Sequence, residues 1–276
     1  MKLGLFYNTA AGGPGKVISN LVLGLNKIGI DINHNDIGDV NGCLNQIRFD
    51  LPKNILMGPN LFVIPTDNIQ LINKYDNFVV PSEWVYDKYK SFDIMKNKNI
   101  FIWSVGIDTD RFVPHKNIKK DCLIYFKNRS DSELSLLIND LDSNGISYHL
   151  LRYGGYTEEE LISKVNEVKS VILLVGTESQ GIAYMEMLSM NTPCYVINKN
   201  CFDYIAGYLF KAISVPYFDD LCGMIVDKFD INSFRIFINN LNSYSPREYI
   251  LKNHTLEISA KKYIEILDYQ KMEDLK

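Results

Sequence analysis

The sequence has few of the residues that build metal centres or disulfide frameworks. Its five cysteines are an odd number without a CxxC spacing, and its four histidines are scattered without an HExxH motif. Small disulfide scaffolds and zinc sites both need closely spaced sets of these residues. We therefore expect reduced, structural cysteines and no metal site.

Long apolar runs and an excess of basic residues are also lacking. No stretch is long enough to cross a bilayer, and the apolar run at the start is too short for a signal peptide. The 33 acidic residues outnumber the 29 Lys and Arg, and the net charge is −4, whereas nucleic-acid binding normally needs a basic face. These features predict a cytoplasmic protein without a nucleic-acid partner.

What the sequence does contain is an alternation of strand-like and helical segments. A short apolar run at 2–7 precedes a glycine-rich stretch, a helical apolar stripe from Val17 to Ile28 and a second strand at 30–33. Further strand-like runs are expected at 54–57, 61–64, 78–80 and 99–103. This order is typical of the opening of a parallel α/β sheet that is covered on both faces.

The alternation starts again after Pro114. The expected strands are 122–126, 147–152, 170–175 and 193–197, and the expected helices are 130–141, 157–168 and 181–190. Two of these helices open with the capping boxes Ser130-x-x-Glu133 and Thr157-x-x-Glu160.

Two such series imply two Rossmann-like domains that face each other across a cleft, with ligands at the carboxyl ends of the strands. The predicted division is an N-terminal Rossmann-like domain at 1–112, a C-terminal one at 113–250 and a packing helix at 251–276.

The glycine-rich stretch GGPGK, residues 12–16, is the first candidate phosphate loop. A nucleotide-hydrolase P-loop would need Gly at position 10 and Ser or Thr at position 17, where the chain has Ala10 and Val17. The dinucleotide fingerprint that starts at Gly13 fails because its third glycine falls on Ile18. What is left is general: backbone amides and a helix N-terminus that favour an anion.

The second candidate is TESQGIAYMEMLSMNTP, residues 177–193. It places Glu178 at the end of a buried strand and Glu186 in the following helix, with seven residues between them. A helix that starts near Gln180 would point its first amides at an anion. Ionised carboxylates only accept hydrogen bonds, so two of them beside a phosphate site suit the hydroxyl groups of ribose and a hexose. The pattern therefore indicates a nucleotide sugar.

This segment resembles the Glu-x7-Glu signature of retaining glycosyltransferases with the GT-B fold, above all the family-four (glycosyltransferase group 1) enzymes. Three further stretches resemble the same family: GGPGKVISNLVLGLNKIG near the N-terminus, VVPSEWV at 79–85, and VGIDTDRFVP at 105–114. The resemblance covers most of the chain in the order that the family has.

The resemblance implies roles for matching residues. Gly12 and Gly13 would approach the donor from the N-terminal domain, Glu186 would bind the ribose hydroxyls, and Glu178 would contact the transferred sugar in the catalytic site. The remaining donor-binding positions are those of the SQGIA segment, which are Ser179, Gln180, Gly181, Ile182 and Ala183. No metal and no other cofactor is implied, because the nucleotide sugar is a substrate.

The family also places an Arg and a Lys after the first strand of the second domain, to neutralise the leaving diphosphate. This chain has YFKNRSDSE there, with Lys127 and Arg129 only two residues apart, and both are catalytic candidates. Tyr153 and Gly154, in RYGGY, occupy the position of a loop that contacts the base.

Three alternatives stay open. A metal-dependent GT-A enzyme would use a DxD motif, and Asp108-Thr109-Asp110 and Asp140-Leu141-Asp142 both have that form. A non-catalytic nucleotide-sugar-binding module would keep the two domains without the chemistry. A NAD-dependent oxidoreductase would need the glycine fingerprint that Ile18 interrupts.

The resemblance therefore implies a metal-independent, retaining hexosyltransferase that uses a UDP- or GDP-sugar. The acceptor would be a hydroxyl group of a glycan, a lipid or a protein, and peripheral contact with a membrane is compatible with the resemblance.

Overall fold

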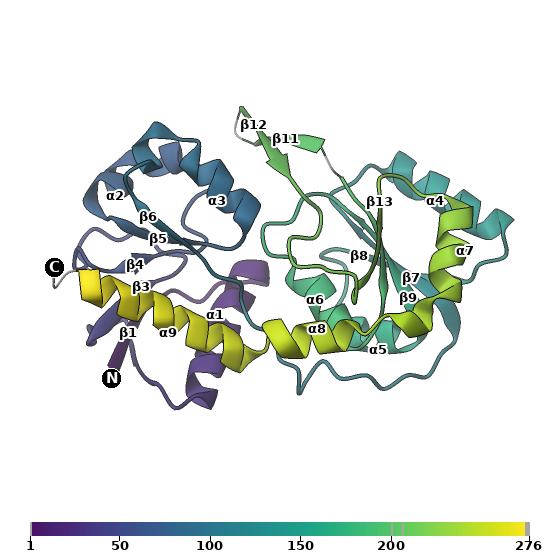
Figure 1. Cartoon of the computed structure of the whole chain (residues 1–276), viewed down its shortest axis with the longest axis horizontal. Coiled ribbons are helices and arrows are strands. Elements are labelled where there is room, and N and C mark those ends of the chain that lie inside the picture. Colours follow the sequence, from purple (N-terminus) through teal and green to yellow (C-terminus); the bar gives the residue numbers. More distant parts are fainter. Residues whose placement is uncertain (1, 200, 206, 274–276) are drawn as a thin grey trace. The chain divides into compact units, whose positions relative to one another are not determined.

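The computed structural model describes residues 2–199, 201–205 and 207–273, and it divides the chain into two compact units. Unit 1 consists of Met1–Gly106, Phe202–Lys211 and His254–Lys276, and unit 2 consists of Ile107–Cys201 and Ala212–Asn253. Figure 1 labels the elements of both units.

Unit 1 is built on a six-stranded parallel sheet with the order β2-β1-β3-β4-β5-β6. Its strands are β1 (Lys2–Phe6), β2 (Asp31–His34), β3 (Val40–Cys43), β4 (Leu56–Met57), β5 (Asn77–Val80) and β6 (Asn99–Ile102). Its helices are α1 (Gly12–Lys27), α2 (Ile69–Lys74), α3 (Glu83–Lys90) and α9 (Leu256–Glu273), with short 3-10 turns at Pro65–Asn68 and Asp93–Met95.

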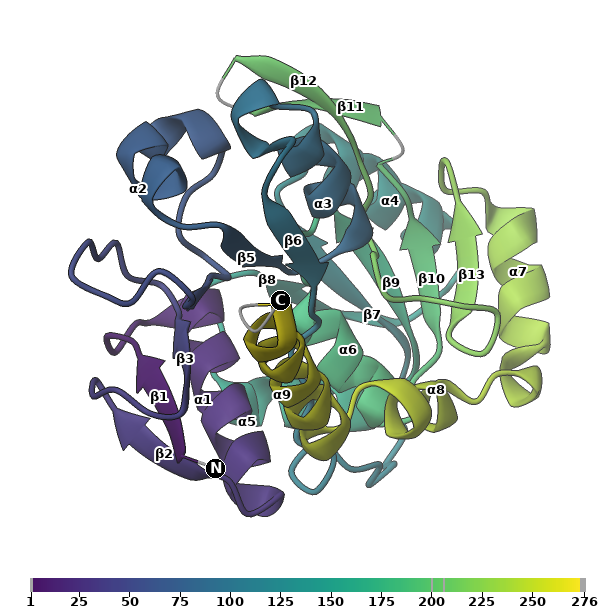
Figure 2. The same ribbon diagram turned by 60° about the vertical axis from the view of Figure 1, so that its left-hand side comes forward.

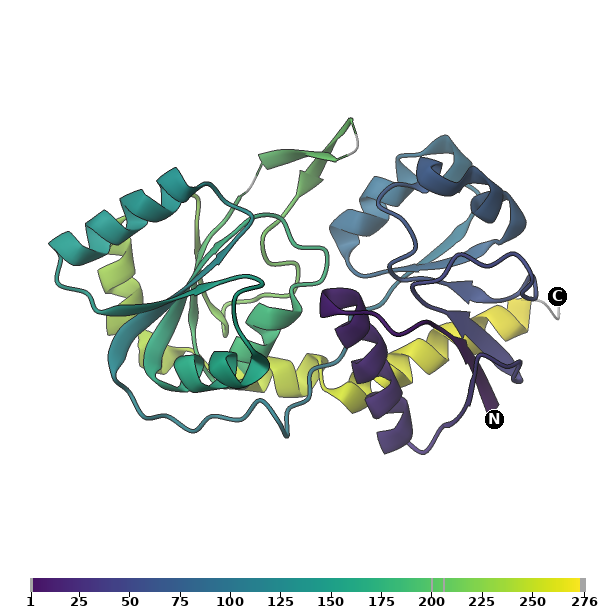
Figure 3. The same cartoon turned by 180° about the vertical axis from the view of Figure 1, so that it is seen from behind.

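The α9 helix joins unit 1 through close packing on α1 and β3, and Figure 3 shows α1 and α9 side by side. A Cβ atom on Gly24 of α1 would lie 2.4 Å from the carbonyl oxygen of Leu256, so only glycine allows this approach. Trp103 donates a 2.9 Å hydrogen bond to the carbonyl of Ser259, and Tyr263 is fully buried. The last described helix is therefore part of the core of unit 1.

Unit 2 contains a five-stranded parallel sheet with the order β13-β10-β9-β7-β8. Its strands are β7 (Lys120–Lys127), β8 (Tyr148–Arg152), β9 (Val168–Val175), β10 (Cys194–Ile197) and β13 (Gly223–Val226). Its helices are α4 (Asp131–Ser143), α5 (Glu158–Asn166), α6 (Ile182–Ser189), α7 (Ile231–Asn239) and α8 (Pro246–Asn253), with a 3-10 turn at Leu241–Ser243.

Alternate side chains of β7 pack into two cores on opposite faces of this sheet. Leu123 and Tyr125 face the core that includes α5 and α6, whereas Ile124 and Phe126 face the core under α4 and α7. Figure 2 shows the sheet between these two pairs of helices. The pleat therefore assigns the next residue, Lys127, to the α6 face.

A two-stranded sheet, β11 (Cys201–Ile205) and β12 (Tyr208–Ala212), follows β10. From β12, the rings of Tyr208 and Phe210 lie 5.0 Å and 6.0 Å from the ring of Phe92, just after α3. Among the described residues, no helix is long and apolar enough to span a bilayer.

The α/β class with two parallel sheets is confirmed. The capping box of α4 is also confirmed, since Ser130 and Glu133 satisfy each other's backbone amides. The strand expected at 61–64 is wrong: this segment is irregular, Asn60 before it has a φ of 67°, and Pro65 opens a 3-10 turn after it. In the described part of the chain, four strands and four helices were not predicted: β3, β11, β12 and β13, with α2, α3, α7 and α8.

Candidate functional site

The predicted donor residues of unit 2 lie at or near the carboxyl edge of its sheet, where β7 and β9 end together. Lys127 pairs with Val175 in the register of these strands, and the amide of Gly176 donates a 2.8 Å hydrogen bond to the carbonyl of Lys127. A Cβ on Gly176 would lie 2.7 Å from the carbonyl oxygen of Asn128, so glycine is required for this approach. The loops that carry Lys127 and Glu178 are therefore held side by side.

Lys127 and Glu178 form an ion pair in this corner. The Nζ atom of Lys127 lies 2.7 Å and 2.9 Å from the two carboxylate oxygens of Glu178, and the side chains are only 17% and 12% exposed. On another side, the ring of Tyr153 has its centroid 4.2 Å from the same Nζ atom. Burial raises the pKa of Glu178 above its ordinary value, and Lys127 opposes that shift.

Glu178 is positioned by the segment that returns from β12. Its amide donates a 3.0 Å hydrogen bond to the carbonyl of Ile213, and the hydroxyl of the neighbouring Ser214 lies 3.3 Å from the carbonyl of Val175. The chain at Glu178 and just before it is thus held by Ile213 and Ser214.

Gly181 starts α6 in a conformation that other residues rarely adopt. Its φ is 77°, and a Cβ there would lie 1.9 Å from the Tyr184 ring. Tyr184 is held in place because its hydroxyl accepts a 2.9 Å hydrogen bond from the amide of Tyr217. The first amides of a helix have no partner within the helix, so Ile182 and Ala183 offer an anion site at this turn.

The SQGIA residues differ in their access to solvent. Ser179 is exposed, Gln180 is buried, and Ile182 and Ala183 are partly buried. The start of α6 is thus only partly open to solvent, mainly at Ser179, Ile182 and Ala183.

Glu186 lies one turn further along α6 and is only 2% exposed. Both glutamates act electrostatically on Tyr156. Burial is the main cause that raises the pKa of Tyr156 to about 12, and the charges of Glu186 and Glu178 both add to the rise. The two glutamates of the Glu-x7-Glu pattern are therefore near the same phenol ring.

Tyr125 and Tyr156 were not predicted from the sequence as site residues. The Tyr156 hydroxyl donates a 3.0 Å hydrogen bond to the Tyr125 hydroxyl, with the rings 6.0 Å apart. The signal available in the sequence was the strand alternation, which puts Tyr125 on the same face of β7 as Lys127.

Arg129 is placed differently from Lys127. Its side chain is 8% exposed, and it donates hydrogen bonds to the carbonyls of Val175 and Ile197 at 3.1 Å and 3.0 Å, as well as to Glu133. It thus holds the carboxyl ends of β9 and β10. The same guanidinium lines a pocket of about 310 Å³ that includes residues of α4 and the segment after β13.

Tyr153 and Gly154 form the turn that follows β8. The Tyr153 amide donates a 2.9 Å hydrogen bond to the carbonyl of Phe126, Gly154 has a φ of 80°, and the Tyr153 side chain is 52% exposed. The ring therefore presents one face to Lys127 and keeps a large part of its surface open.

In unit 1, Gly12 and Gly13 begin α1. Gly12 has a φ of 65°, and a Cβ at either position would meet no atom within 4 Å. The N-cap residue, Ala11, supplies no side-chain hydrogen bond to the first turn. By contrast, a Cβ on Gly15 would lie 1.9 Å from the carbonyl oxygen of Ala10. The backbone is therefore tightly packed at Gly15, whereas there is free space beside Gly12 and Gly13.

The two DxD sequences have structural surroundings of their own. Asp108 accepts hydrogen bonds of 3.2 Å from the amides of Asp110 and Arg111, as the acceptor of a tight turn. Asp140 and Asp142 lie on α4, where residues two apart point to different faces. In the part of the chain that the structure describes, no group of three or more His, Cys, Asp and Glu is arranged to hold a metal.

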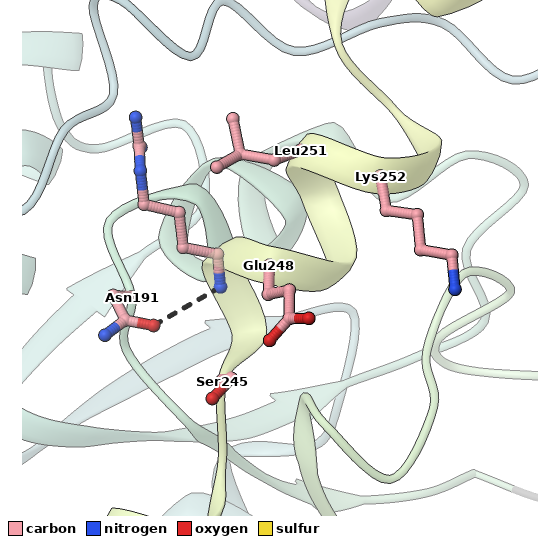
Figure 4. A pocket seen from close by; sticks show the side chains of 6 residues that line it. Asn191, Ser245, Glu248, Leu251 and Lys252 are labelled. Atoms are coloured by element: carbon pink, nitrogen blue, oxygen red, sulfur yellow. Dashed lines mark hydrogen bonds between the residues drawn. The ribbon is translucent and has the colours of Figure 1, made fainter.

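A larger, open pocket of about 620 Å³ lies elsewhere on unit 2, and Figure 4 shows residues from α8 and the turn after α6 around it. There Arg247 donates from its amide to Asn191 at 3.3 Å and from its guanidinium to the carbonyls of Ser189 and Phe112 at 2.6 Å and 3.0 Å. These contacts fix the end of α6 to the GIDTDRF segment, so the pocket is a feature of the scaffold.

No known family profile and no curated protein matches this sequence. Solved structures do match. A sucrose-phosphate synthase from Thermosynechococcus elongatus has a TM-score of 0.60 and 11% identity, with 100% of both chains covered. The catalytic domain of starch synthase IV from Arabidopsis thaliana, bound to ADP and acarbose, has a TM-score of 0.58 and 10% identity over 98% of this chain and 99% of that one.

The lipopolysaccharide outer core galactosyltransferase WaaB, in its apo form, has a TM-score of 0.57 and 12% identity over 98% of this chain and 100% of that one. These identities are low, so the likeness concerns the fold. The chain has the GT-B fold found in these glycosyltransferases, which confirms the fold predicted from the sequence.

Proposed function

We propose that this chain is a glycosyltransferase that moves a sugar from a nucleotide-diphosphate sugar to a hydroxyl group of a glycan, lipid or protein acceptor. The observation that carries the proposal is the Lys127–Glu178 pair beside the first turn of α6, the helix that also carries Glu186. The GT-B fold supports it, since the matched structures are sugar transferases.

In this proposal each part of the donor has a partner in unit 2. The amides at Gly181 to Ala183 bind the diphosphate, Glu186 accepts hydrogen bonds from the ribose, and Glu178 accepts them from the transferred sugar. The half-exposed ring of Tyr153 offers a stacking face to the base. In unit 1, the backbone of Gly12 and Gly13 is the proposed contact to the donor.

We assign neutralisation of the diphosphate to Lys127 rather than to Arg129. The Lys127 ammonium lies beside Glu178, whereas the Arg129 guanidinium is occupied by two strand-end carbonyls and Glu133. Arg129 supports the edge of the sheet on which Lys127 and Glu178 stand.

The proposed reaction retains the anomeric configuration. The bond between the sugar C1 and the phosphate oxygen breaks, the acceptor oxygen bonds to C1 from the same face, and the acceptor proton passes to the leaving diphosphate. Negative charge then grows on the phosphate, where Lys127 and the first turn of α6 stabilise it. No protein nucleophile is needed for this step.

We propose that the reaction needs no divalent metal, because the ammonium and helix amides supply the positive charge that a metal would supply. UDP- and GDP-sugars are the proposed donors. Cys43, Cys122, Cys194 and Cys222 are buried and free, which supports a reducing compartment such as the cytoplasm.

Thermal-shift measurements with UDP, GDP, UDP-glucose and GDP-mannose, with NAD and ATP as controls, test the donor site. We expect stabilisation by one nucleotide pair, since a ligand that binds only the folded state raises the melting temperature. Stabilisation by NAD or ATP alone would refute the proposal.

Donor hydrolysis then separates an enzyme from a binding module. The enzyme should release nucleoside diphosphate from its donor at an unchanged rate in EDTA. Strict dependence on Mg²⁺ or Mn²⁺ would instead favour DxD chemistry, and binding without any turnover would favour the module.

A further inference from the structure

The ion pair between Lys127 and Glu178 joins two groups that the proposed function uses for different parts of the donor. Lys127 contacts both carboxylate oxygens of Glu178, at 2.7 Å and 2.9 Å, and both side chains are largely buried. In this arrangement the cation intended for the diphosphate is neutralised by the anion intended for the sugar.

The surroundings of the ammonium make this competition strong. The Tyr153 ring lies 4.2 Å from Nζ, and the side chains have low exposure, so water screens the charges weakly. A phosphate that reaches Lys127 must also come close to the Glu178 carboxylate. Phosphate and carboxylate repel each other unless another group satisfies Glu178.

We infer that Glu178 makes the site select an intact nucleotide sugar over the free nucleoside diphosphate. The inference rests on the proposed function and deepens it. The hydroxyl groups of the bound sugar donate hydrogen bonds to Glu178 and replace Lys127 as its partner, and the ammonium then turns to the diphosphate. The free nucleoside diphosphate brings the negative charge but has no hydroxyl group in the sugar position. Glu178 then keeps its pairing with Lys127 and repels the phosphate, so the diphosphate binds more weakly.

This selection also acts after transfer. Once the sugar has left, Glu178 loses its hydroxyl partners and competes again for Lys127. The diphosphate product is then held by a weaker positive charge, and its release is faster than that of a nucleotide bound by an uncompensated lysine.

The test compares affinities by isothermal titration calorimetry for UDP, UDP-glucose, GDP and GDP-mannose. In Glu178→Gln we expect about tenfold tighter binding of the free diphosphate that the wild type recognises, because the competing charge is gone. The same variant should bind the matching nucleotide sugar no more tightly than the wild type. The ratio of the two affinities then shifts at least about tenfold toward the diphosphate.

Glu167→Gln is the matched control. Glu167 is a unit 2 glutamate whose side chain is 14% exposed, close to the 12% of Glu178, and it pairs with Lys119 at 2.6 Å and His149 at 3.0 Å. Glu167→Gln removes the same charge at the opposite end of β9 from Glu178. Its affinity ratio should therefore stay within about twofold of the wild type, as expected for a distant and independent site. An equal shift in the control would overturn the local role of Glu178.

Glu178→Ala makes the same charge change with a smaller side chain and serves if Glu178→Gln does not fold. An unchanged ratio, or an equal loss of affinity for both ligands, overturns the inference while the wild type still binds nucleotides. If the wild type itself binds none of the four ligands, the proposed function fails first.

Discussion

The sequence predicts two donor-binding segments, a glycine-rich one at the start of α1 and an acidic one at the start of α6, and their structures differ. At the start of α1 in unit 1, Gly12 and Gly13 border open space, and the cap carries no side-chain hydrogen bond. At the start of α6 in unit 2, Gly181 is packed against Tyr184, and charged side chains meet beside it. The first site offers bare backbone, and the second offers backbone together with fixed charges.

A second contrast lies within unit 2. Lys127 and Arg129 are two residues apart, but one pairs with the site carboxylate and the other with strand-end carbonyls. Proximity in sequence does not decide function here, since the chain turns at Asn128, which has a φ of 53°. Five predictions distinguish residues that bind the donor from residues that stabilise the fold.

Replacing Lys127 with Met should have the largest effect. We expect turnover to fall by about 10²- to 10³-fold, because the variant lacks the charge that stabilises the leaving diphosphate. Steady-state kinetics with the preferred donor measure it, and Lys119→Met is the control with an exposed lysine. A loss of less than about tenfold would show that another group neutralises the phosphate.

Replacing Arg129 with Leu should lower stability rather than chemistry. The variant leaves the carbonyl groups of Val175 and Ile197 without their donor and the partly exposed Glu133 without its cation. We expect a loss of about 1–3 kcal/mol in the free energy of unfolding. Urea denaturation measures this loss, and turnover per folded molecule should stay near the wild-type value. Lost turnover at wild-type stability would return Arg129 to the diphosphate site.

Two glycine variants sharpen the comparison in unit 1. Gly15→Ala places a Cβ against the Ala10 carbonyl and should cost about 1–3 kcal/mol of stability. Gly13→Ala meets no atom within 4 Å, so its stability should be unchanged, but donor affinity should fall if the backbone approaches the donor. Thermal unfolding and donor titration distinguish the two, and wild-type affinity in Gly13→Ala would remove Gly13 from the site.

Replacing Glu186 with Gln tests the ribose contact. Affinity for the nucleotide should fall about tenfold, since a hydrogen bond to a charged group is replaced by one to a neutral amide. Calorimetry with the nucleoside diphosphate provides the measurement. Unchanged affinity would assign the buried carboxylate to the fold of α6 instead.

The smallest expected effect is a pH dependence of stability near α4. The hydrogen bond from Arg129 lowers the pKa of Glu133 to about 2, from an ordinary value of 4.5. A lowered carboxyl pKa stabilises the folded state above pH 4.5, and that contribution is lost as the pH falls toward 2. Urea denaturation at several pH values in this window gives the free energy of unfolding as a function of pH. That free energy should change less with pH in Arg129→Leu than in the wild type, and an identical dependence would contradict the pairing of Arg129 with Glu133.

The sequence predicted the α/β class and the elements with regular apolar patterns, including β1, β7, β9 and α4. It did not predict β3, whose residues VNGC include Asn and Gly, because this strand is defined by burial between neighbours rather than by its own preference. For Leu61 to Ile64 the error was the opposite one: a strand was predicted and none forms. The apolar run has a turn on each side, which prevents it from pairing with a neighbouring strand.

Within the site, the Glu-x7-Glu spacing singled out Glu178 and Glu186, and the structure places both near Tyr156. The different surroundings of Lys127 and Arg129 could not be predicted, because they depend on which strand ends reach each side chain. The Tyr125–Tyr156 pair joins residues 31 positions apart, which local pattern reading does not connect.

The packing of α9 on α1 has a consequence for how the chain is made. Unit 2 has all its residues once Asn253 has been synthesised, whereas unit 1 still lacks the helix that covers α1 and β3. The apolar surface of unit 1 that Tyr263 and Leu267 pack against stays exposed until the ribosome has synthesised α9. The unit that begins the chain is therefore the last to complete its core.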